Sequence, residues 1–377
     1  MNSLSQSRRR VVFALALVLC LSASADSAAQ KDDKKKEPAP QGTPVLWQDP
    51  GDISARDLLA GPGPEMKPDL SSVTFVRDEM GGYSPKFRVT DGAGKTWVAK
   101  FGKEAQPETA AVRLAWAIGY VTEVAHLVPC VQIKNAPEPR KEVERCDGKG
   151  FANVRFEARP DEWKRLENWS WKENPFAGQR EFQGLVVLMG LINNWDLKDA
   201  NNKIVYVPGA DAGSGELRYL ISDLGATFGK TGNFITHDRN NPKNFAKSKF
   251  IERVEGGRVR FSYDGKNTGL FDDIGVENAR WLGEQLARLS DKQIEDAFRA
   301  ANYAGGDLQT LVAEVRSRID ELTALPGPAA EAATPAATPA AAATPAAAAT
   351  PTDTPAATPT PAATPSVTPT PGSPEKR

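Results

Sequence analysis

Histidine is almost absent from this chain, with only His126 and His237 among its 377 residues. This scarcity argues against zinc hydrolases, Ser-His-Asp catalysis and phosphohistidine chemistry, because each of these depends on imidazole groups. Within the segment VAHLVP, His126 is expected to be a core residue rather than a ligand.

Cysteine is also scarce, with three residues in the whole chain. Cys20 lies in the N-terminal apolar run, so only Cys130 and Cys146 remain in the part expected to fold. In an oxidising compartment these two could form a disulfide. Two free thiols are an equal alternative, because the sequence fixes no distance between them.

Neither sign of charge prevails: 47 Lys and Arg face 48 Asp and Glu, for a net charge of −1. We therefore expect no nucleic-acid partner. The apolar run from Val11 to about Leu21 is shorter than the roughly 20 residues of a membrane span. It follows Arg8, Arg9 and Arg10 and precedes small residues, so residues 1–29 read as a secretory signal peptide rather than an uncleaved anchor.

Low-complexity segments lie on either side of the part expected to fold. Residues 30–65, which contain the charged spacer KDDKKKEPAPQGTP from Lys31 on, are interpreted as a linker. Residues 326–377 are an Ala/Thr/Pro-rich segment that predicts a disordered, partly extended tail. Cell-wall association through this tail is one hypothesis, and an inert linker is the simpler one. The protein is expected to be exported, to the periplasm, the cell envelope or the medium.

The first part of the folded region combines strands with one helix. Pro107 suits the first turn of that helix, and apolar residues recur at helical spacing up to Gly119. Strands are expected at 73–80, 85–91, 95–101, 127–134 and 151–158.

The second part is mainly helical. Ser290 and Gln293 have the spacing of a capping box, which places a helix start at Ser290. Helices are expected at 179–194, 277–289, 290–303 and 307–323, with hairpin strands at 202–209 and 216–223. The predicted fold class is therefore α+β, with a strand-rich lobe over 66–160 and a helical lobe over 161–325.

Lys100 is the last residue but one of the predicted strand 95–101 and points to the same side as Val98, because side chains alternate along a strand. A lysine in this position can bind a phosphate while Val98 covers a flat ring. Taken alone, a solvated strand lysine is the more common case. Glu108 stands in the first turn of the next helix, where the helix dipole already favours a carboxylate. Its functional alternative is an ion pair with Lys100.

Four polar residues follow the buried helix 179–194 in an order that suits phosphoryl transfer. Asp196, Lys198 and Asn201 form D-L-K-x-x-N, and Asp223 ends a strand just before Gly225. Magnesium takes oxygen ligands, often a carboxylate with an amide. An attacking hydroxyl needs a carboxylate to accept its proton, and a cation offsets the charge on the transferred group.

These motifs resemble those of the protein-kinase-like superfamily. DLKDAN followed by SDLG resembles its catalytic loop and metal-binding motif, WVAKFG its lysine strand, and EMGGYSPKFRV its glycine-rich hairpin. The pattern is most similar to the atypical branch, which includes HipA-type bacterial kinases, phosphatidylinositol 4-kinases and secretory-pathway kinases. The resemblance covers about residues 70 to 305 and implies a bilobal fold, with a small antiparallel sheet and one helix in the N-lobe.

The resemblance also implies a nucleotide-binding group. Lys100 would bind the α and β phosphates of ATP, and Glu108 would hold Lys100. Glu104 is a rival partner for Lys100. Gly81 and Gly82 would let backbone amides approach the phosphates.

The catalytic and metal-binding roles follow in the same way. Asp196 would orient or deprotonate the acceptor hydroxyl, and Lys198 would steady the γ phosphate. Asn201 and Asp223 would ligate Mg²⁺ or Mn²⁺.

The leading hypothesis is an exported atypical kinase that transfers the γ-phosphoryl group of ATP to a hydroxyl acceptor. A pseudokinase or nucleotide-binding scaffold is the alternative, and a non-enzymatic cell-envelope protein is a third. An aromatic cluster is interpreted as packing between the lobes, with a stacking surface for sugar or lipid as the other option; it comprises Trp163, Trp169, Trp171 and Phe176.

Overall fold

The computed structural model describes residues 40–210, 214–233 and 235–327. The predicted signal peptide (1–29) lies outside the described residues, as does the predicted tail from residue 328 on. Within the described part, no helix is both long enough and apolar enough to cross a membrane.

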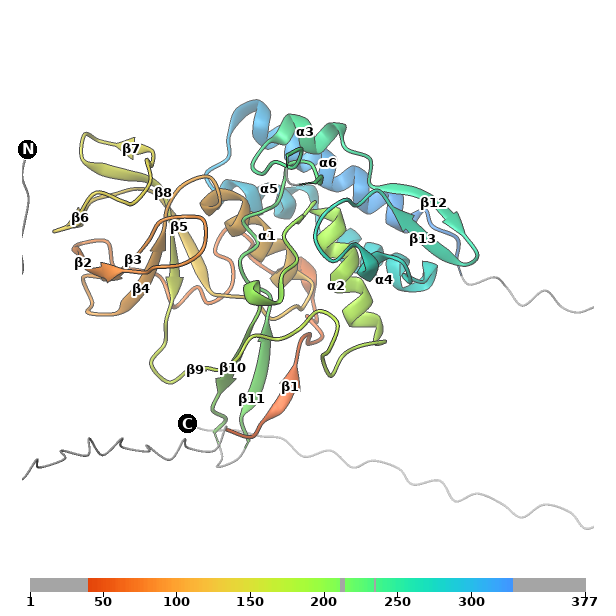
Figure 1. Ribbon diagram of the computed structural model, residues 1–377, viewed down its shortest axis with the longest axis horizontal. Coiled ribbons are helices and arrows are strands. Elements are labelled where there is room, and N and C mark those ends of the chain that lie inside the picture. The colour runs from red at the N-terminus through yellow and green to blue at the C-terminus, as the bar shows by residue number, and fades with distance from the viewer. Residues whose placement is uncertain (1–39, 211–213, 234, 328–377) are drawn as a thin grey trace, which may run out of the picture. The chain divides into compact units, whose positions relative to one another are not determined.

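The larger sheet follows the order β5-β8-β4-β3-β2-β6, with β7 paired to β8 (Figure 1). Its neighbours are antiparallel except β2 and β6, which run parallel. The predicted antiparallel meander is therefore confirmed for its first three strands. The bounds are β2 Val73–Asp78, β3 Lys86–Thr90, β4 Thr96–Lys100, β5 Ala125–Val131, β6 Ile133–Lys134, β7 Arg145–Cys146 and β8 Gly150–Ala158.

The disulfide between Cys130 and Cys146 links β5 to β7, with a Cα–Cα distance of 5.9 Å. The sequence left this pairing open.

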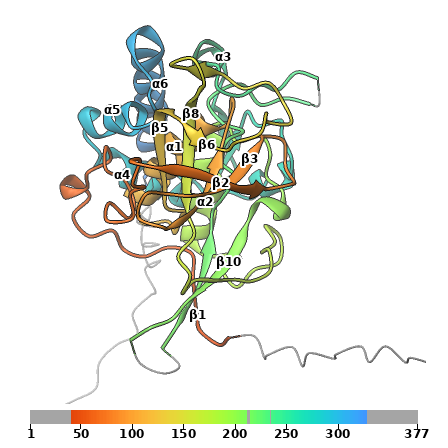
Figure 2. The same cartoon turned by 90° about the vertical axis from the view of Figure 1, so that its left-hand side faces the viewer.

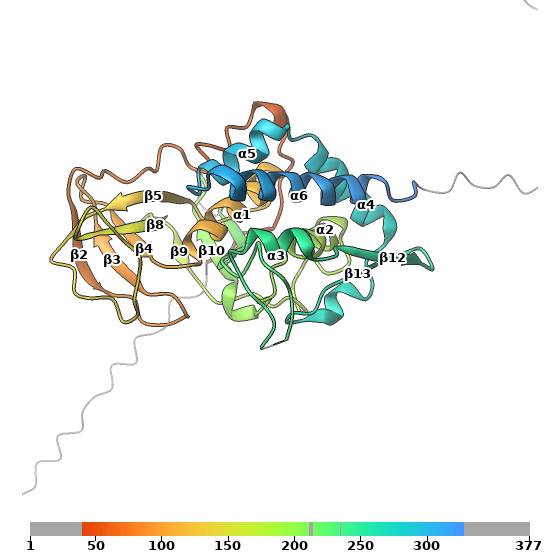
Figure 3. The same cartoon turned by 90° about the horizontal axis from the view of Figure 1, so that it is seen from above.

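Helix α1 (Ala105–Ala117) lies between the larger sheet and the helical part, as Figures 1 and 3 show. Nearly all of its residues are buried, because it contacts β5 and β8 on one side and α5 (Asp291–Arg299) on the other. Its first turn is therefore fixed against both parts of the fold, which matters for Glu108.

A second sheet has the order β1-β11-β10-β9. Its bounds are β1 Thr43–Val45, β9 Lys164–Arg165, β10 Lys203–Val207 and β11 Glu216–Leu220. The presence of β1 corrects the predicted linker at 30–65. β1 pairs in parallel with β11, and Leu46, Ile53 and Leu58 are at most 2% exposed. Residues 40–65 thus belong to the folded unit, and Ile53–Ala55 form a short 3-10 helix, η1.

The helical part is built from α2 to α6, seen from above in Figure 3. Their bounds are α2 Arg180–Leu191, α3 Pro242–Lys247, α4 Val276–Ala287, α5 Asp291–Arg299 and α6 Gly305–Thr323, with the 3-10 helices η2 Asp199–Asn201 and η3 Thr268–Phe271. A hairpin of β12 (Ile251–Glu255) and β13 (Arg258–Phe261) stands between α3 and η3. The sequence predicted α2, α4, α5 and α6, but neither α3 nor this hairpin.

Two apolar clusters fill the molecule. One consists of sheet residues such as Phe87, Trp97 and Phe156. The other joins α1 to the helical part through residues such as Leu114, Leu188 and Leu311. The α+β class is confirmed, and the two clusters are consistent with the predicted two lobes.

Candidate active site

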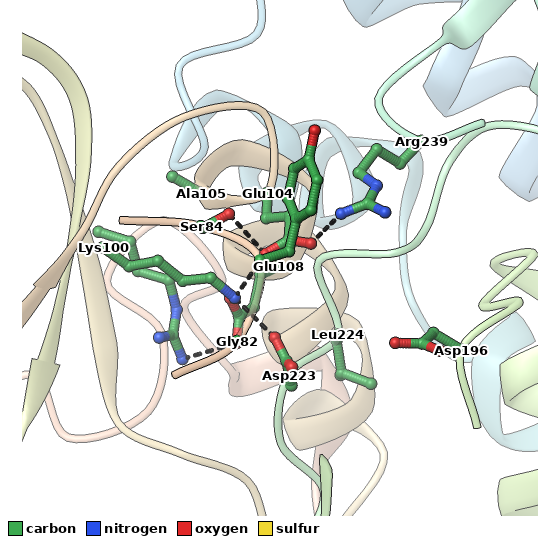
Figure 4. A network of polar contacts seen from close by, with 12 residues as sticks. Gly82, Ser84, Lys100, Glu104, Ala105, Glu108, Asp196, Asp223, Leu224 and Arg239 are labelled. Carbon is green, nitrogen blue, oxygen red and sulfur yellow. Dashed lines mark hydrogen bonds and ion pairs between the residues drawn. The ribbon is translucent and has the colours of Figure 1, made fainter. Parts of the chain in front are cut away.

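Lys100 is buried rather than solvated, with 4% of its surface exposed. Its ammonium donates to Glu108 Oε2 at 2.9 Å and to Asp223 Oδ1 at 2.6 Å, and pairs with Glu104 Oε2 at 3.1 Å (Figure 4). Glu108 and Glu104, the two partners predicted for Lys100, therefore both contact its ammonium. Burial lowers the pKa of Lys100, but the facing carboxylates, led by Glu108, outweigh burial and raise the pKa well above its usual value. Lys100 is thus a cation at neutral pH.

The sheet explains how this cation is positioned. Trp97, Ala99 and Phe101 belong to the apolar cluster of the larger sheet, so Val98 and Lys100 face the other way, as alternation predicts. Val98 is 4% exposed on that face.

Arg155 lies directly opposite Lys100 on β8. Two cations side by side would repel, but Glu108 lies between them, with Oε1 at 3.3 Å from Arg155 and Oε2 at 2.9 Å from Lys100. Arg155 also donates to Glu157 at 2.9 Å. Glu108 is therefore held by two buried cations, which fixes its orientation.

Asp223 follows β11 and has a positive φ of 55°, rare for a residue with a Cβ. Such conformations persist where the surroundings impose them, and they cluster at functional sites. Gly225 allows this loop to approach α1, since a Cβ there would lie 2.5 Å from the Glu104 Cβ. Attraction to Lys100 is the main cause that holds the pKa of Asp223 below its usual value. Its half-exposed carboxylate is therefore an anion at neutral pH.

Asp196 lies in the loop between α2 and η2. Lys198 donates to its Oδ2 at 2.7 Å, and Lys266 pairs with its Oδ1 at 3.0 Å. Burial raises the pKa of Asp196, but the hydrogen bonds and charges of the two lysines outweigh burial, so the pKa lies below its usual value. The pKa of Lys198 is lowered by burial and raised more strongly by Asp196, so Lys198 is a cation.

Asn201 is the last residue of η2, which follows that loop. Its Nδ2 donates to the backbone oxygen of Asp196 at 2.7 Å, and its own carbonyl accepts from Ser222 Oγ at 2.6 Å. The second contact connects the Asp196 loop to the residue before Asp223. No hydrogen bond to Asn201 Oδ1 or Asp223 Oδ2 occurs among the described residues.

These free oxygens test whether the site suits a divalent metal ion. One carboxylate and one amide oxygen match the hard-ligand preference of Mg²⁺ and Mn²⁺. In the described ranges no three His, Cys, Asp or Glu side chains gather into a metal cluster. The donor set is therefore too small for a metal site built from protein alone, but it fits an ion that also takes oxygens from phosphate and water.

A cavity of about 600 Å³ brings most of these groups together. This volume is within the usual range of small-ligand pockets. Of the predicted site residues, it is lined by Gly82, Asp196, Lys198, Asn201 and Asp223. Lys100 lies behind Asp223 and does not line it, and neither do Gly81, Val98 and Glu108. Figure 4 shows Asp196 apart from the cluster around Lys100.

Several cavity residues were not predicted. Arg239 forms an ion pair with Glu104, and its guanidinium lies 4.8 Å from the ring centres of both Tyr83 and Trp195. Lys266 comes from the segment after β13. The sequence offered no signal for Arg239 or Lys266, because both reach the cavity from loops with no motif.

Three members of the predicted aromatic cluster are core residues. Trp169, Trp171 and Phe176 are at most 8% exposed, and Trp169 and Trp171 pack with ring centres 4.9 Å apart. Trp163 is partly buried against the sheet cluster. The three buried residues therefore pack within the cluster that joins α1 to the helical part.

The chain is similar in structure to several kinases. The proinflammatory kinase CtkA of Helicobacter pylori matches at 10% identity, with 67% of this chain and 93% of that chain covered and a TM-score of 0.40. The Golgi casein kinase, solved with Mn and ADP, matches at 11%, with 68% and 72% covered and a TM-score of 0.36. The Rio2 kinase of Chaetomium thermophilum, solved as an ADP/Mg²⁺-phosphoaspartate complex, matches at 14%, with 67% and 72% covered and a TM-score of 0.30.

No protein-family model and no curated protein matches the sequence. At these TM-scores, the case for the chemistry of this chain rests on its own side chains.

Proposed function

We propose that this protein is a phosphotransferase that moves the γ-phosphoryl group of ATP to a hydroxyl acceptor. One observation carries the proposal: a single cavity is lined by Gly82, Asp196, Lys198, Asn201 and Asp223, with buried Lys100 directly behind Asp223. The cavity thus offers an ionised base, fixed cations and free oxygen ligands.

The reaction breaks the bond between the γ phosphorus and its bridging oxygen and forms a bond from phosphorus to the acceptor oxygen. Asp196 is ionised at neutral pH and can take the acceptor proton. Lys198, beside Asp196, carries a charge that offsets the charge on the transferred group. Lys100 supplies a second cation, and Glu108 together with Arg155 fixes where it points.

Asn201 and Asp223 are the residues that would hold Mg²⁺ or Mn²⁺ in this proposal. The bound ion would neutralise phosphate charge.

The test is transfer from labelled ATP, with Mg²⁺ or Mn²⁺, by the wild-type protein and by Asp223→Ala. Asp161→Ala, an exposed carboxylate outside the cavity, is the matched control. We expect transfer or hydrolysis by wild type and by the control, and at least a 100-fold loss in Asp223→Ala, the scale set by removal of one preorganised electrostatic group. Equal rates in all three proteins would refute the proposal.

A nucleotide-binding scaffold without turnover is the second candidate. It is favoured by the ion pairs of Asp196 with Lys198 and Lys266. These two lysines occupy both carboxylate oxygens, which makes it harder for Asp196 to accept the proton of an acceptor hydroxyl. Binding without transfer would support it. A ligand at a hundred times its dissociation constant adds about 2.7 kcal/mol of stability, which a melting curve detects.

The non-enzymatic envelope protein is the third candidate. It would be favoured if nucleotides leave the melting temperature of the protein unchanged.

Export is part of the proposal. Its sequence evidence lies in residues 1–29, and the Cys130–Cys146 disulfide supports it, because disulfides persist mainly in oxidising compartments. N-terminal sequencing of the mature protein tests it, with cleavage after Ala25 or Ala29 as the expected result.

A further inference from the structure

The turn between β2 and β3, residues Gly81 to Ser84, is held from outside the cavity. We call it the glycine turn. Arg140 Nη2 donates to the carbonyls of Gly81, Gly82 and Ser84 at 3.1, 2.9 and 2.8 Å. Because one nitrogen reaches three oxygens, a single side chain sets the direction of three peptide groups.

Lys141, the next residue, adds a second contact. Its ammonium donates to the carbonyl of Tyr83 at 2.7 Å and lies 3.4 Å from the centre of the Tyr83 ring. All four carbonyls of the glycine turn are therefore engaged by two neighbouring cations that do not line the cavity.

The orientation of the amides follows from the planar trans peptide, in which C=O and N–H point in opposite directions. If the carbonyls of Gly81 and Gly82 face Arg140, the N–H groups of Gly82 and Tyr83 face away from it. Neither N–H donates a hydrogen bond within the part of the chain that the structure describes. Gly82 and Tyr83 both line the cavity, and successive free amides of this kind form an anion site.

The loop that carries Arg140 and Lys141 is itself closed. The Cys130–Cys146 disulfide spans 16 residues and encloses both cations. At its ends, β6 pairs with β2 and β7 pairs with β8. Arg145 lies over the Phe151 ring at 4.2 Å. The covalent link limits how far the two cations can move from the glycine turn.

We propose that Arg140 and Lys141 are positioning residues which, on the disulfide-closed loop, hold the glycine turn so that the N–H groups of Gly82 and Tyr83 bind nucleotide phosphate. The inference rests on the proposed function in one respect, that the cavity takes a nucleotide.

The first experiment measures ATP, ADP and adenosine binding by calorimetry in the full chain. The variants are Arg140→Ala, Arg140→Lys and the double variant Cys130→Ser/Cys146→Ser, with Lys149→Ala as a matched control that removes one exposed charge nearby. We expect Arg140→Ala to weaken ATP and ADP binding by about 3- to 10-fold, the range for a hydrogen bond to an exposed charged group.

Adenosine binding should be unchanged, because adenosine lacks the phosphates that the amides would hold. Arg140→Lys should restore part of the loss, and the double cysteine variant should resemble Arg140→Ala. Equal weakening of adenosine and ATP, or unchanged ATP affinity in Arg140→Ala, would overturn the inference.

A second experiment needs no nucleotide. The Glu79 N–H donates to Lys86 O at 2.9 Å at the base of the glycine turn. Its hydrogen exchange should quicken in Arg140→Ala and in the double cysteine variant, but not in Lys149→Ala. If wild type binds no nucleotide, the proposed function fails, but hydrogen exchange still reports whether Arg140 holds the glycine turn. Unchanged exchange in Arg140→Ala would show that Arg140 does not hold the glycine turn, even if wild type binds ATP.

Discussion

At the scale of single residues, the order of Lys100, Asp196, Asn201 and Asp223 along the sequence resembles that of the kinase-like superfamily, and this resemblance predicted a shared site. The residues that surround them were not predictable. Arg155 reaches Glu108 only because β8 pairs with β4, and this pairing depends on the whole sheet.

Replacing Lys100 by Met should affect both binding and stability. Glu108 would keep its ion pair with Arg155, and Glu104 would keep its ion pair with Arg239, but both would lose Lys100. Breaking a buried ion pair in this way should lower the free energy of unfolding by about 3 kcal/mol. Under the proposed function, nucleotide binding should also weaken by about tenfold or more, because a charge-assisted contact with phosphate is lost. Urea unfolding and calorimetry measure the two effects, with exposed Lys103→Met as the control. A variant as stable as wild type would contradict the buried network.

His126 should make stability depend on pH. Burial, assisted by the charges of Arg113 and Lys67, lowers the pKa of His126 to about 4. The unfolded chain binds this proton below about pH 6.5, whereas the folded protein binds it only below its lower pKa. Stability should therefore fall as pH drops from 6.5 to 4, by on the order of 3 kcal/mol from this residue.

Denaturant unfolding at several pH values, compared between wild type and His126→Gln, isolates this contribution. His237→Gln serves as the control, because it removes the other histidine of the chain. Identical pH profiles for wild type and His126→Gln would contradict the expectation.

At the scale of elements, the long periodic segments were predictable and the short ones were not. The capping box at Ser290 and Gln293 is formed as its spacing indicated. Strand β1 has three residues and no apolar alternation, so only its partner β11 makes it a strand. The β12–β13 hairpin has mostly exposed side chains on β12, which gave no pattern to read.

Gln293 has a second role that the capping motif did not reveal. Its Nε2 donates to the carbonyls of Ile53 and Arg56 at 2.9 Å each and to Ser54 at 3.3 Å. Gln293→Ala should therefore cost about 2–3 kcal/mol, against about 1 kcal/mol for Ser290→Ala, which removes the cap alone. Urea midpoints of the two variants measure the difference. Equal losses would show that the contact with η1 adds nothing.

At the scale of the whole molecule, the sheet and the helical part meet around α1, and the sheet strands overlie the helices in Figure 2. The segment 40–65 contributes β1 to the second sheet and three buried side chains to the cluster that joins α1 to the helical part. Its composition resembles that of a linker because its buried residues are few and widely spaced, so the sequence alone could not assign it to the fold.

A chain that starts at residue 66 should be much less stable than one that starts at residue 40. It lacks Leu46, Ile53 and Leu58, and each such core side chain contributes roughly 2–5 kcal/mol. The sum is comparable with the entire stability of a typical domain, about 5–15 kcal/mol. Thermal unfolding of the two chains is the measurement. Similar melting temperatures would mean that the segment is peripheral.

Arg318 in α6 is fully buried and donates to the carbonyls of Leu191, Phe245 and Ser248, and to Asn193 Oδ1 at 2.9 Å. Leu191 ends α2 and Asn193 follows it, so the segment that leads to Asp196 is held by a residue more than a hundred positions later in the sequence. A chain that ends before α6 lacks these hydrogen bonds. Under the proposed function, such fragments should fail to be retained on immobilised ATP, whereas the full chain should be retained.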